Sequence, residues 1–255
     1  MHINYFKQKN ILIIGASYGI GEALATNLAN LGANLFLRAR SKDKIEELAR
    51  SLDGNHFSQI CDVTKKVQVT ELLKIVKANF KKIDIIIFAA GIYEPMSLEN
   101  YNQNKAHNIL NVNFSSMLNF LDFFKQEAKE NNLSQISIIS SSAAYFGMPN
   151  SLIYGASKAA LSHLTESLYH ELMNFNVKVQ LINPGFVKTR LTDKNDFNMP
   201  NLITADKAAK IIIKALTKTK FEISFPYLFI LMMKLFKFLP FKFRALLLNK
   251  MVSKK

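Results

Sequence analysis

Short runs of β-branched and other apolar residues alternate along the chain with longer segments whose apolar positions recur every three or four residues. Runs of the first kind are typical of strands buried on both faces, and segments of the second kind are typical of helices. Strands are predicted over residues 11–14, 34–37, 56–61, 83–88, 136–140 and 177–182. Helices are predicted over residues 20–30, 44–51, 67–80, 105–130, 153–175 and 205–216. This alternation predicts a single-domain α/β fold with a doubly wound, Rossmann-like parallel sheet.

The last part of the chain differs from the rest in composition. Residues 221–255, here called the C-terminal extension, contain seven Lys or Arg against one acid, Glu222, and seven of the twenty Phe. Pro240 interrupts this segment, so two short helices are predicted. Large apolar residues mixed with cations are typical of helices lying in the plane of an anionic membrane surface, here through residues 225–255. Alternatively, the aromatic residues cover the substrate pocket or a subunit interface.

The overall composition restricts the class of protein. Hydrophobic residues make up 49% and charged residues 20% of the 255 residues, which excludes wholesale disorder. A single cysteine, Cys61, excludes a disulfide scaffold and a thiolate zinc cluster, and no metal site is predicted. The net charge of +14 favours an anionic partner: a phosphorylated cofactor, a nucleic acid or an anionic membrane. No charge-free apolar run reaches about 18 residues and no export-signal pattern is present, so we expect a cytoplasmic protein, with association limited to the cytoplasmic face of a membrane.

A glycine-rich segment follows the first predicted strand and precedes the first predicted helix. It contains Gly15, Gly19 and Gly21 at the spacing G-x-x-x-G-x-G. Glycines at such a turn allow backbone N–H groups to approach a pyrophosphate, whose charge the N-terminus of the following helix also stabilises. The position between a strand and a helix favours this phosphate site over the alternative of a tight structural turn.

Two arginines follow the second predicted strand. A site that prefers NAD usually has a carboxylate at this strand end, where it binds the ribose hydroxyls, but this chain has Arg38 and Arg40 and no acid. Because a guanidinium binds a phosphate through paired hydrogen bonds, the pattern favours NADP(H), with NAD(H) as the alternative cofactor. The competing interpretation is that both arginines are merely solvated.

The candidate acid–base chemistry lies in the C-terminal half of the chain. Tyr154 and Lys158 are four residues apart in a predicted helix and therefore share one face. Such pairs occur by chance on many helices, but here Ser141 follows an apolar strand and Asn113 lies in the preceding predicted helix. A tyrosine with a pKa near ~10 is a poor base at neutral pH, and a close ammonium group favours its phenolate form. The set is therefore suited to general acid–base chemistry.

Together these motifs resemble the short-chain dehydrogenase/reductase family, and the resemblance extends over residues 10–226. The matching motifs, in the order of the family, are Gly15/Gly19/Gly21, Cys61-Asp62-Val63, Ala89-Ala90-Gly91, Asn113, Ile139-Ser140-Ser141, Tyr154/Lys158 and Asn183-Pro184-Gly185 through Thr189. With the change in composition at residue 221, we expect a Rossmann-like catalytic domain over residues 1–220 and an amphipathic extension of it over residues 221–255. Two positions depart from the family pattern: Ile14 replaces the usual threonine, and Phe88-Ala89 replaces the usual asparagine pair. We expect apolar packing between Ile14 and Phe88 to replace the lost polar contact.

The resemblance implies a role for each matching residue. Tyr154 corresponds to the catalytic acid/base, Ser141 to the serine that holds the substrate oxygen, and Lys158 to the lysine that binds the nicotinamide ribose and lowers the pKa of the tyrosine. Asn113 corresponds to the asparagine whose backbone positions a water in a proton relay. Residues 191–202 are expected to be a loop that covers the substrate pocket. The cofactor contacts implied are Gly15, Ser17, Tyr18, Gly19, Ile20, Gly21, Arg38, Arg40, Asp62, Val63, Ala89, Ala90, Gly91, Tyr154, Lys158, Pro184, Gly185, Val187 and Thr189.

The activity implied is an NADP(H)-dependent interconversion of a carbonyl and an alcohol, and the C-terminal extension suggests an apolar or lipid-like small molecule as substrate. The alternative is a non-catalytic NADP(H)-binding regulatory protein on the same fold. No nucleic-acid-binding motif accompanies the basic charge, so no nucleic acid is expected as a partner. A homodimer or homotetramer is expected because these are usual in the resembling family.

Overall fold

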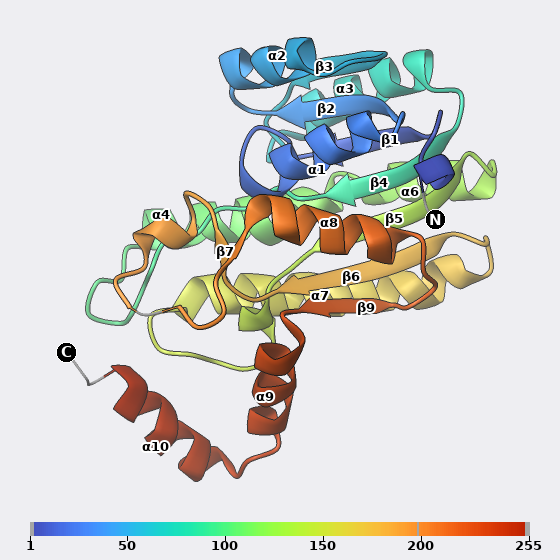
Figure 1. Cartoon of the computed structure of the whole chain (residues 1–255). Helices are drawn as coiled ribbons and strands as arrows, with labels where there is room; N and C mark the ends of the chain where they lie inside the picture. The colour runs from blue at the N-terminus through green and yellow to red at the C-terminus, as the bar shows by residue number, and fades with distance from the viewer. Residues whose placement is uncertain (1–2, 198, 253–255) are drawn as a thin grey trace.

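The computed structural model of the protein describes residues 3–197 and 199–252. Its centre is a seven-stranded sheet in the order β3-β2-β1-β4-β5-β6-β9, and every neighbouring pair is parallel (Figure 1). The predicted doubly wound parallel sheet is therefore confirmed. Its strands are β1 (Asn10–Ile14), β2 (Asn34–Ala39), β3 (His56–Ile60), β4 (Ile83–Phe88), β5 (Leu133–Ile139), β6 (Lys178–Pro184) and β9 (Glu222–Phe225). The short strands β7 (Val187–Lys188) and β8 (Ile203–Thr204) pair separately, beyond the carboxyl end of β6.

Helices cover both faces of this sheet (Figure 1). Buried residues of α1, α2 and α8 belong to one hydrophobic cluster, and those of α3, α6 and α7 belong to a second cluster on the other face. The α-helices of the body are α1 (Gly19–Asn30), α2 (Lys42–Ser51), α3 (Lys66–Asn79), α4 (Gln103–Leu110), α5 (Ser116–Leu118), α6 (Leu121–Lys129), α7 (Leu152–Met173) and α8 (Ala205–Leu216). Single turns of 3-10 helix occur at η1 (Ile3–Tyr5), η3 (Ser142–Ala144) and η4 (Thr192–Lys194).

The continuous apolar run of β1 is explained by its central position in the sheet. Ile11 and Ile13 pack into the first cluster, while Leu12 and Ile14 pack into the second, and all four are fully buried. Alternate side chains of a strand point to opposite faces, so a strand covered on both faces has to be apolar throughout. Ile14 pairs in register with Phe88 of β4, and both lie in the second cluster, which confirms the expected apolar packing between these two positions.

The single helix predicted over residues 105–130 is wrong. The chain there forms α4, a π-helical turn η2 (Asn111–Ser115), α5, a turn at residues 119–120 and α6. In the turn, the side-chain amide of Asn119 donates a hydrogen bond to the carbonyl oxygen of Val63, at 2.8 Å. Apolar residues on both sides of the interruption, such as Met117 and Phe123, enter the same cluster. The hydrophobic periodicity of the sequence therefore continues through residues 111–120, although the regular α-helix is interrupted there.

The C-terminal extension begins inside the sheet. Its residues 222–225 form β9, which pairs with β6 and which the sequence pattern did not predict, because a four-residue strand shows too little periodicity. The part outside the sheet starts at Pro226 and contains α9 (Tyr227–Lys237) and α10 (Phe241–Val252), which extend away from the body beyond β9 (Figure 1). These are the two short helices predicted around Pro240.

Within the described ranges, no helix combines the length and the apolar character that crossing a bilayer requires.

Candidate active site

A cavity of about 640 Å³ lies at the carboxyl ends of the parallel strands, where open α/β sheets bind their ligands. The turns after β1, β2, β4, β5 and β6 all contribute to its walls. Every predicted cofactor contact lines this one cavity, and so does Ser141. Residues that are scattered over the sequence are thus brought together because parallel strands place all their carboxyl ends at one edge of the sheet.

The glycine-rich turn between β1 and α1 is closely packed against the turn after β4. A Cβ atom at Gly15, whose φ is +96°, would lie 2.6 Å from the backbone nitrogen of Ala90, and one at Gly21 would overlap the carbonyl oxygen of Gly15. Tyr18 is the N-cap of α1, but its side chain makes no capping hydrogen bond. The first N–H groups of α1 therefore face the cavity without a side-chain cap, which fits the pyrophosphate of a dinucleotide.

The two arginines at the carboxyl end of β2, Arg38 and Arg40, have different environments. Arg38 is buried, and burial lowers its pKa, an effect that the neighbouring Cys61 opposes. The Nε atom of Arg38 has no hydrogen-bond partner among the described residues. Arg40 is exposed, and both arginines line the cavity. The interpretation that both arginines are merely solvated is therefore wrong for Arg38. The guanidinium of Arg40 is the more accessible of the two to a ligand in the cavity.

Tyr154 and Lys158 lie in the first two turns of α7, beside the segment that follows β5. The Lys158 side chain is buried, and its Nζ atom donates a hydrogen bond to the carbonyl oxygen of Ile139, at 3.0 Å. Nζ also lies 6.0 Å from the centroid of the Tyr154 ring. Burial lowers the pKa of Lys158 to about 8, so its amine titrates close to neutral pH.

The pKa of Tyr154 is raised by burial, and a hydrogen bond with the Ser141 side chain opposes this rise. The resemblance implied a lowered pKa, caused by the ammonium group of Lys158. With the protein's own groups alone, burial outweighs the other contributions, because the Lys158 amine is directed to the carbonyl of Ile139. Tyr154 is therefore a protonated phenol, hydrogen-bonded to Ser141, in this arrangement.

Asn113 does not line the cavity but lies behind it, in the π-helical turn η2, where it is fully buried. Its Oδ1 atom accepts a hydrogen bond from the backbone nitrogen of Ile92, at 2.8 Å, and its Nδ2 atom donates to the carbonyl oxygen of Ile92 and to Oγ of Ser157, both at 3.0 Å. The side chain thus joins the turn after β4 to α7. A π-helical turn frequently marks a functional position, because it frees backbone groups from the regular helical pattern.

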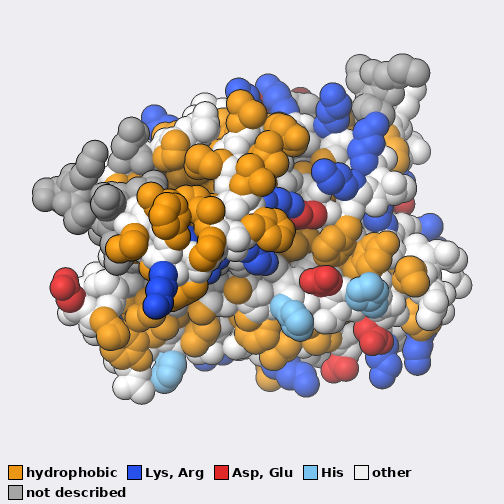
Figure 2. Space-filling model, turned by 90° about the horizontal axis from the view of Figure 1, so that it is seen from below, with side chains coloured by type: hydrophobic (Ala, Val, Ile, Leu, Met, Phe, Trp, Pro, Cys, Tyr) orange, Lys and Arg blue, Asp and Glu red, His pale blue; other side chains and the backbone are white. Residues whose placement is uncertain are grey.

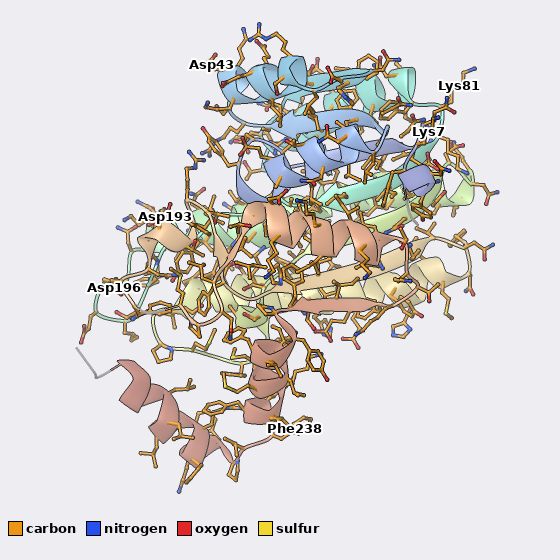
Figure 3. The ribbon with its side chains drawn as sticks, viewed as in Figure 1. Lys7, Asp43, Lys81, Asp193, Asp196 and Phe238 are labelled. Carbon is orange, nitrogen blue, oxygen red and sulfur yellow. The ribbon has the colours of Figure 1, made fainter. Side chains whose placement is uncertain are left out.

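Sequence reasoning missed Tyr93, which lies beside Tyr154. The two rings meet edge to face, with their centroids 4.8 Å apart. The hydroxyl of Tyr93 donates a hydrogen bond to Oδ1 of Asn195, at 2.8 Å, and burial raises the pKa of Tyr93 to about 12. Lys194 forms an ion pair with Glu94 and donates to the carbonyl oxygen of Tyr93. Lys194 and Asn195 therefore lie against the turn after β4, at the end of the molecule where Figure 3 labels Asp193 and Asp196. The only sequence signal was an aromatic residue two positions after Gly91.

No group of three or more His, Cys, Asp or Glu residues in the described ranges is arranged to hold a metal ion.

The parallel sheet, the glycine-rich turn and the tyrosine–lysine pair on one cavity define a dinucleotide-binding oxidoreductase. A family model described as short chain dehydrogenase matches residues 9–199. The chain belongs to the short-chain dehydrogenase/reductase family and is an NAD(P)-dependent oxidoreductase. An uncharacterised oxidoreductase of Staphylococcus epidermidis is 32% identical to it over 212 residues, which are 83% of this chain and 92% of that protein.

Two solved structures share the fold. A 3-ketoacyl-(acyl-carrier-protein) reductase from Brucella melitensis, complexed with NADH, matches with a TM-score of 0.77 and 22% identity, over 86% of this chain and 97% of that one. ElxO with NADP bound matches with a TM-score of 0.75 and 24% identity, over 85% of this chain and 96% of that one. At these identities the likeness establishes the architecture, and the chemistry has to be argued from this chain's own residues.

Proposed function

We propose that the protein is an NADP(H)-dependent oxidoreductase that interconverts a carbonyl and an alcohol, with Tyr154 as the acid/base. The observation that carries this proposal is that Tyr154, Ser141 and Lys158 line the same cavity as the glycine-rich turn. A dinucleotide lying along this cavity would bring its reactive ring close to the phenol. A nicotinamide bound there would supply or accept the hydride.

The remaining steps belong to the chain's own side chains. In the reducing direction, Tyr154 donates its proton to the carbonyl oxygen as negative charge develops there, and the hydroxyl of Ser141 donates a hydrogen bond to the same oxygen. In the oxidising direction, Tyr154 accepts the proton of the alcohol. Lys158, with its pKa of about 8, holds a positive charge beside the phenol near neutral pH and binds ribose hydroxyls. Tyr93, which packs against the Tyr154 ring and is hydrogen-bonded to Asn195, would help to exclude water from the phenol.

The preference for NADP(H) is supported by Arg40. Its exposed side chain lines the cavity at the end of β2, where no acidic residue offers a carboxylate to the ribose hydroxyls. The solved neighbours contain NADP in one case and NADH in the other, so they support a nicotinamide dinucleotide without a preference.

The test is a panel of carbonyl compounds, including long-chain and steroid-like ketones, assayed by the absorbance of NADPH. Oxidation of NADPH that depends on one class of ketone supports the proposal. Tight binding of NADPH with no turnover on any member of the panel favours the alternative, a regulatory protein that binds the dinucleotide. The Asn113, Ser141, Tyr154 and Lys158 set supports the enzyme over this alternative, since binding a dinucleotide does not require a tyrosine hydrogen-bonded to a serine on the cavity wall.

A second proposal concerns the outer face of the C-terminal extension, which we propose docks on the cytoplasmic face of an anionic membrane. Side chains on one side of α9, including Phe229 and Met233, are buried against the body. The other side is largely apolar as well, since Leu228 is 75% exposed. Phe238, the residue that follows α9, is 85% exposed and lies at the end of the helix (Figure 3). An outer face that exposes this many large apolar side chains needs a partner.

The charges around this outer face support a lipid headgroup as the partner. Figure 2 shows hydrophobic side chains gathered with Lys and Arg on the face seen from below. Neither α9 nor α10 contains an acidic residue. The exposed apolar residues of α9, of the turn after it and of α10 are Tyr227, Leu228, Leu231, Met232, Leu235, Phe238, Phe241, Phe243 and Leu246. The apolar part would enter the acyl boundary while the cations approach anionic lipid.

An aromatic path supports a lipid-like substrate. Phe186, after β6, packs against Phe229 of α9 with ring centroids 5.6 Å apart, and against Phe197 of the 191–202 segment at 5.7 Å. The inner side of α9 is thus joined through Phe186 to Phe197, within the segment that we expect to cover the substrate pocket. A long apolar substrate could follow this path from a membrane surface to the phenol.

Docking is tested with vesicles of phosphatidylglycerol and of phosphatidylcholine. The full chain should sediment with the anionic vesicles only, and the double variant Phe238→Ser/Phe241→Ser should stay in the supernatant. Val67→Ser is a matched control, because Val67 is 81% exposed on α3. Equal sedimentation of the double variant and the wild type would contradict docking. Self-association that the double variant loses would instead identify this face as a subunit interface, as expected for a homodimer or homotetramer.

A further inference from the structure

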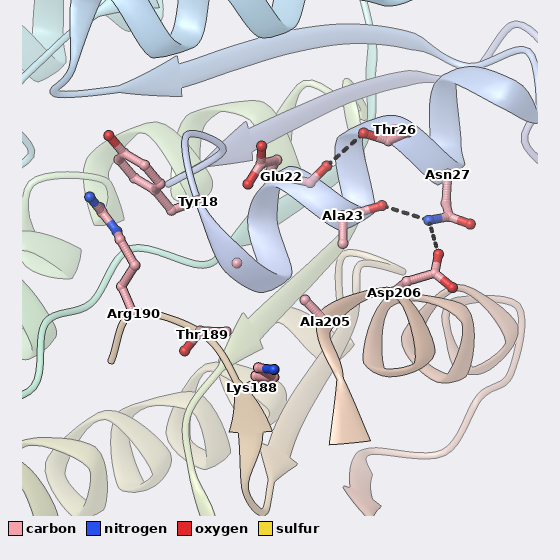
Figure 4. Close-up of a pocket in the computed structure, with 11 residues that line it drawn as sticks. Tyr18, Glu22, Ala23, Thr26, Asn27, Lys188, Thr189, Arg190, Ala205 and Asp206 are labelled. Carbon is pink, nitrogen blue, oxygen red and sulfur yellow. Dashed lines mark hydrogen bonds between the residues drawn. The ribbon is translucent and has the colours of Figure 1, made fainter. Parts of the chain in front are cut away.

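Arg190 lies against the turn that begins α1, although it follows β7 in the sequence. Its guanidinium carbon lies 3.0 Å from the centroid of the Tyr18 ring (Figure 4). The side chain is exposed, and none of the ion pairs within residues 3–197 and 199–252 includes it. Stacking occupies the flat face of a guanidinium and leaves the N–H groups at its edge available to an anion.

This stack lies at the boundary between two cavities. The dinucleotide cavity and an outer cavity of about 480 Å³ share four lining residues, namely Tyr18, Gly19, Thr189 and Arg190. The side chain of Thr189, the residue before Arg190, packs against the glycine-rich turn, because a Cβ atom at Gly19 would lie 2.9 Å from Cγ2 of Thr189. Arg190 thus follows a residue that packs close to the start of α1, and its guanidinium lies over the Tyr18 ring.

We propose that Arg190 binds the pyrophosphate of the dinucleotide, an assignment that rests on the proposed function. The uncapped N-terminus of α1 stabilises one side of a pyrophosphate, and the edge of the Arg190 guanidinium supplies charge-assisted hydrogen bonds from the other side. The Tyr18 ring orients the guanidinium before the ligand arrives, which reduces the entropy that is lost on binding. Arg40, at the end of β2, remains the residue that distinguishes NADPH from NADH.

The experiment measures the Kd of NADPH and of NADH by fluorescence titration on the full chain. Arg190→Ala should raise both constants by about tenfold, since both dinucleotides contain the pyrophosphate and a charge-assisted hydrogen bond is lost. It should also weaken the dependence of Kd on salt concentration, because one cation fewer faces the ligand. Arg190→Lys, which keeps the charge without the planar fork, should give intermediate constants.

Lys188→Ala is the matched control. Lys188 is an exposed cation two residues before Arg190, and it lines the outer cavity but not the dinucleotide cavity. Its removal should leave both constants within about twofold of the wild type. Unchanged constants in Arg190→Ala, at an unchanged Tm, would overturn the assignment. A loss confined to NADPH would overturn it too, because Arg190 would then read the 2′-phosphate. Wild-type protein that binds neither dinucleotide would overturn the proposed function together with this assignment.

Discussion

Glu222 of β9 connects α9 to the body of the protein through a half-buried carboxylate. It accepts hydrogen bonds from the hydroxyl of Tyr145 at 2.6 Å and from the amide of Asn183 at 3.1 Å, and it forms an ion pair with Lys234 of α9. Burial acts against the charged form, yet the hydrogen bonds from Lys234, Tyr145 and Asn183 outweigh it and lower the pKa of Glu222. The folded protein therefore stabilises this carboxylate, and with it the position of α9.

The substitution Glu222→Gln removes the charge and keeps the volume of the side chain. The amide retains one carbonyl oxygen for a neutral donor, but the ammonium group of Lys234 loses its anion. A hydrogen bond to a charged group contributes about 1.5–3 kcal/mol. The Lys234 side chain is 40% exposed, so solvent screening reduces the expected loss of unfolding free energy to about 1–2 kcal/mol.

The loss should depend on pH. Since the pKa of Glu222 is lower in the folded protein than in the unfolded chain, its contribution is complete above the unfolded pKa of about 4.3 and disappears as the pH falls through the folded pKa. The unfolding free energies of wild type and Glu222→Gln should therefore differ at pH 7, and the difference should begin to shrink only below about pH 4.3 and vanish below the folded pKa of Glu222. Urea unfolding followed by circular dichroism measures both, because the chain has no tryptophan.

The control is Glu171→Gln, an exposed acid on α7, which should change the unfolding free energy by less than about 0.5 kcal/mol. Limited proteolysis within residues 226–240 should accelerate in Glu222→Gln alone, since α9 is held less firmly. A Glu222→Gln protein as stable as the wild type at pH 7, or a loss that does not shrink as the pH is lowered from about 4.3 toward the acid limit of the folded state, would refute the reasoning.

Three further predictions concern the cavity. Tyr154→Phe should lower kcat by about 10²–10⁴-fold, because the proton donor is lost, while the Kd of NADPH stays unchanged; retained turnover would show that another group transfers the proton. Arg40→Asp should weaken NADPH at least about tenfold and leave or improve NADH binding, because a carboxylate repels the 2′-phosphate and accepts ribose hydroxyls; an unchanged ratio of the two constants would exclude Arg40 as the discriminating residue. Gly15→Ala should destabilise the protein by about 1–3 kcal/mol in thermal unfolding, since a Cβ atom there would lie 2.6 Å from the Ala90 nitrogen at a φ of +96°; a Tm equal to that of the wild type would show that the turn after β4 can move away.

Most of the fold follows from local patterns that are legible in the sequence. The runs that form β1, β4 and β6 are apolar because both faces of the sheet are covered by helices. This requirement appears in the sequence as a continuous apolar run. Patterns fail where an element is short or interrupted. β9 has four residues, and the break around Asn113 and Asn119 depends on hydrogen bonds to residues far away in the sequence.

The candidate site divides in the same way. The roles of Gly15, Tyr154 and Lys158 could be predicted from their spacing in the sequence. Each spacing corresponds to a local geometry, that of a tight turn or of one face of a helix. The contacts of Tyr93 with Asn195 and of Arg190 with Tyr18 have no such spacing, since about a hundred residues or more separate the partners.

By itself, the sequence determined the class of fold, the edge of the sheet where a ligand binds and the residue types available for chemistry there. It did so because secondary structure and the direction of parallel strands depend on residues that are neighbours in the chain. Only the tertiary structure decided that Arg38 is buried while Arg40 is exposed, that burial raises the pKa of Tyr154, and that α9 has two apolar sides. Burial and electrostatic environment are set by all the elements that pack around a group, and those elements meet only when the whole chain has folded.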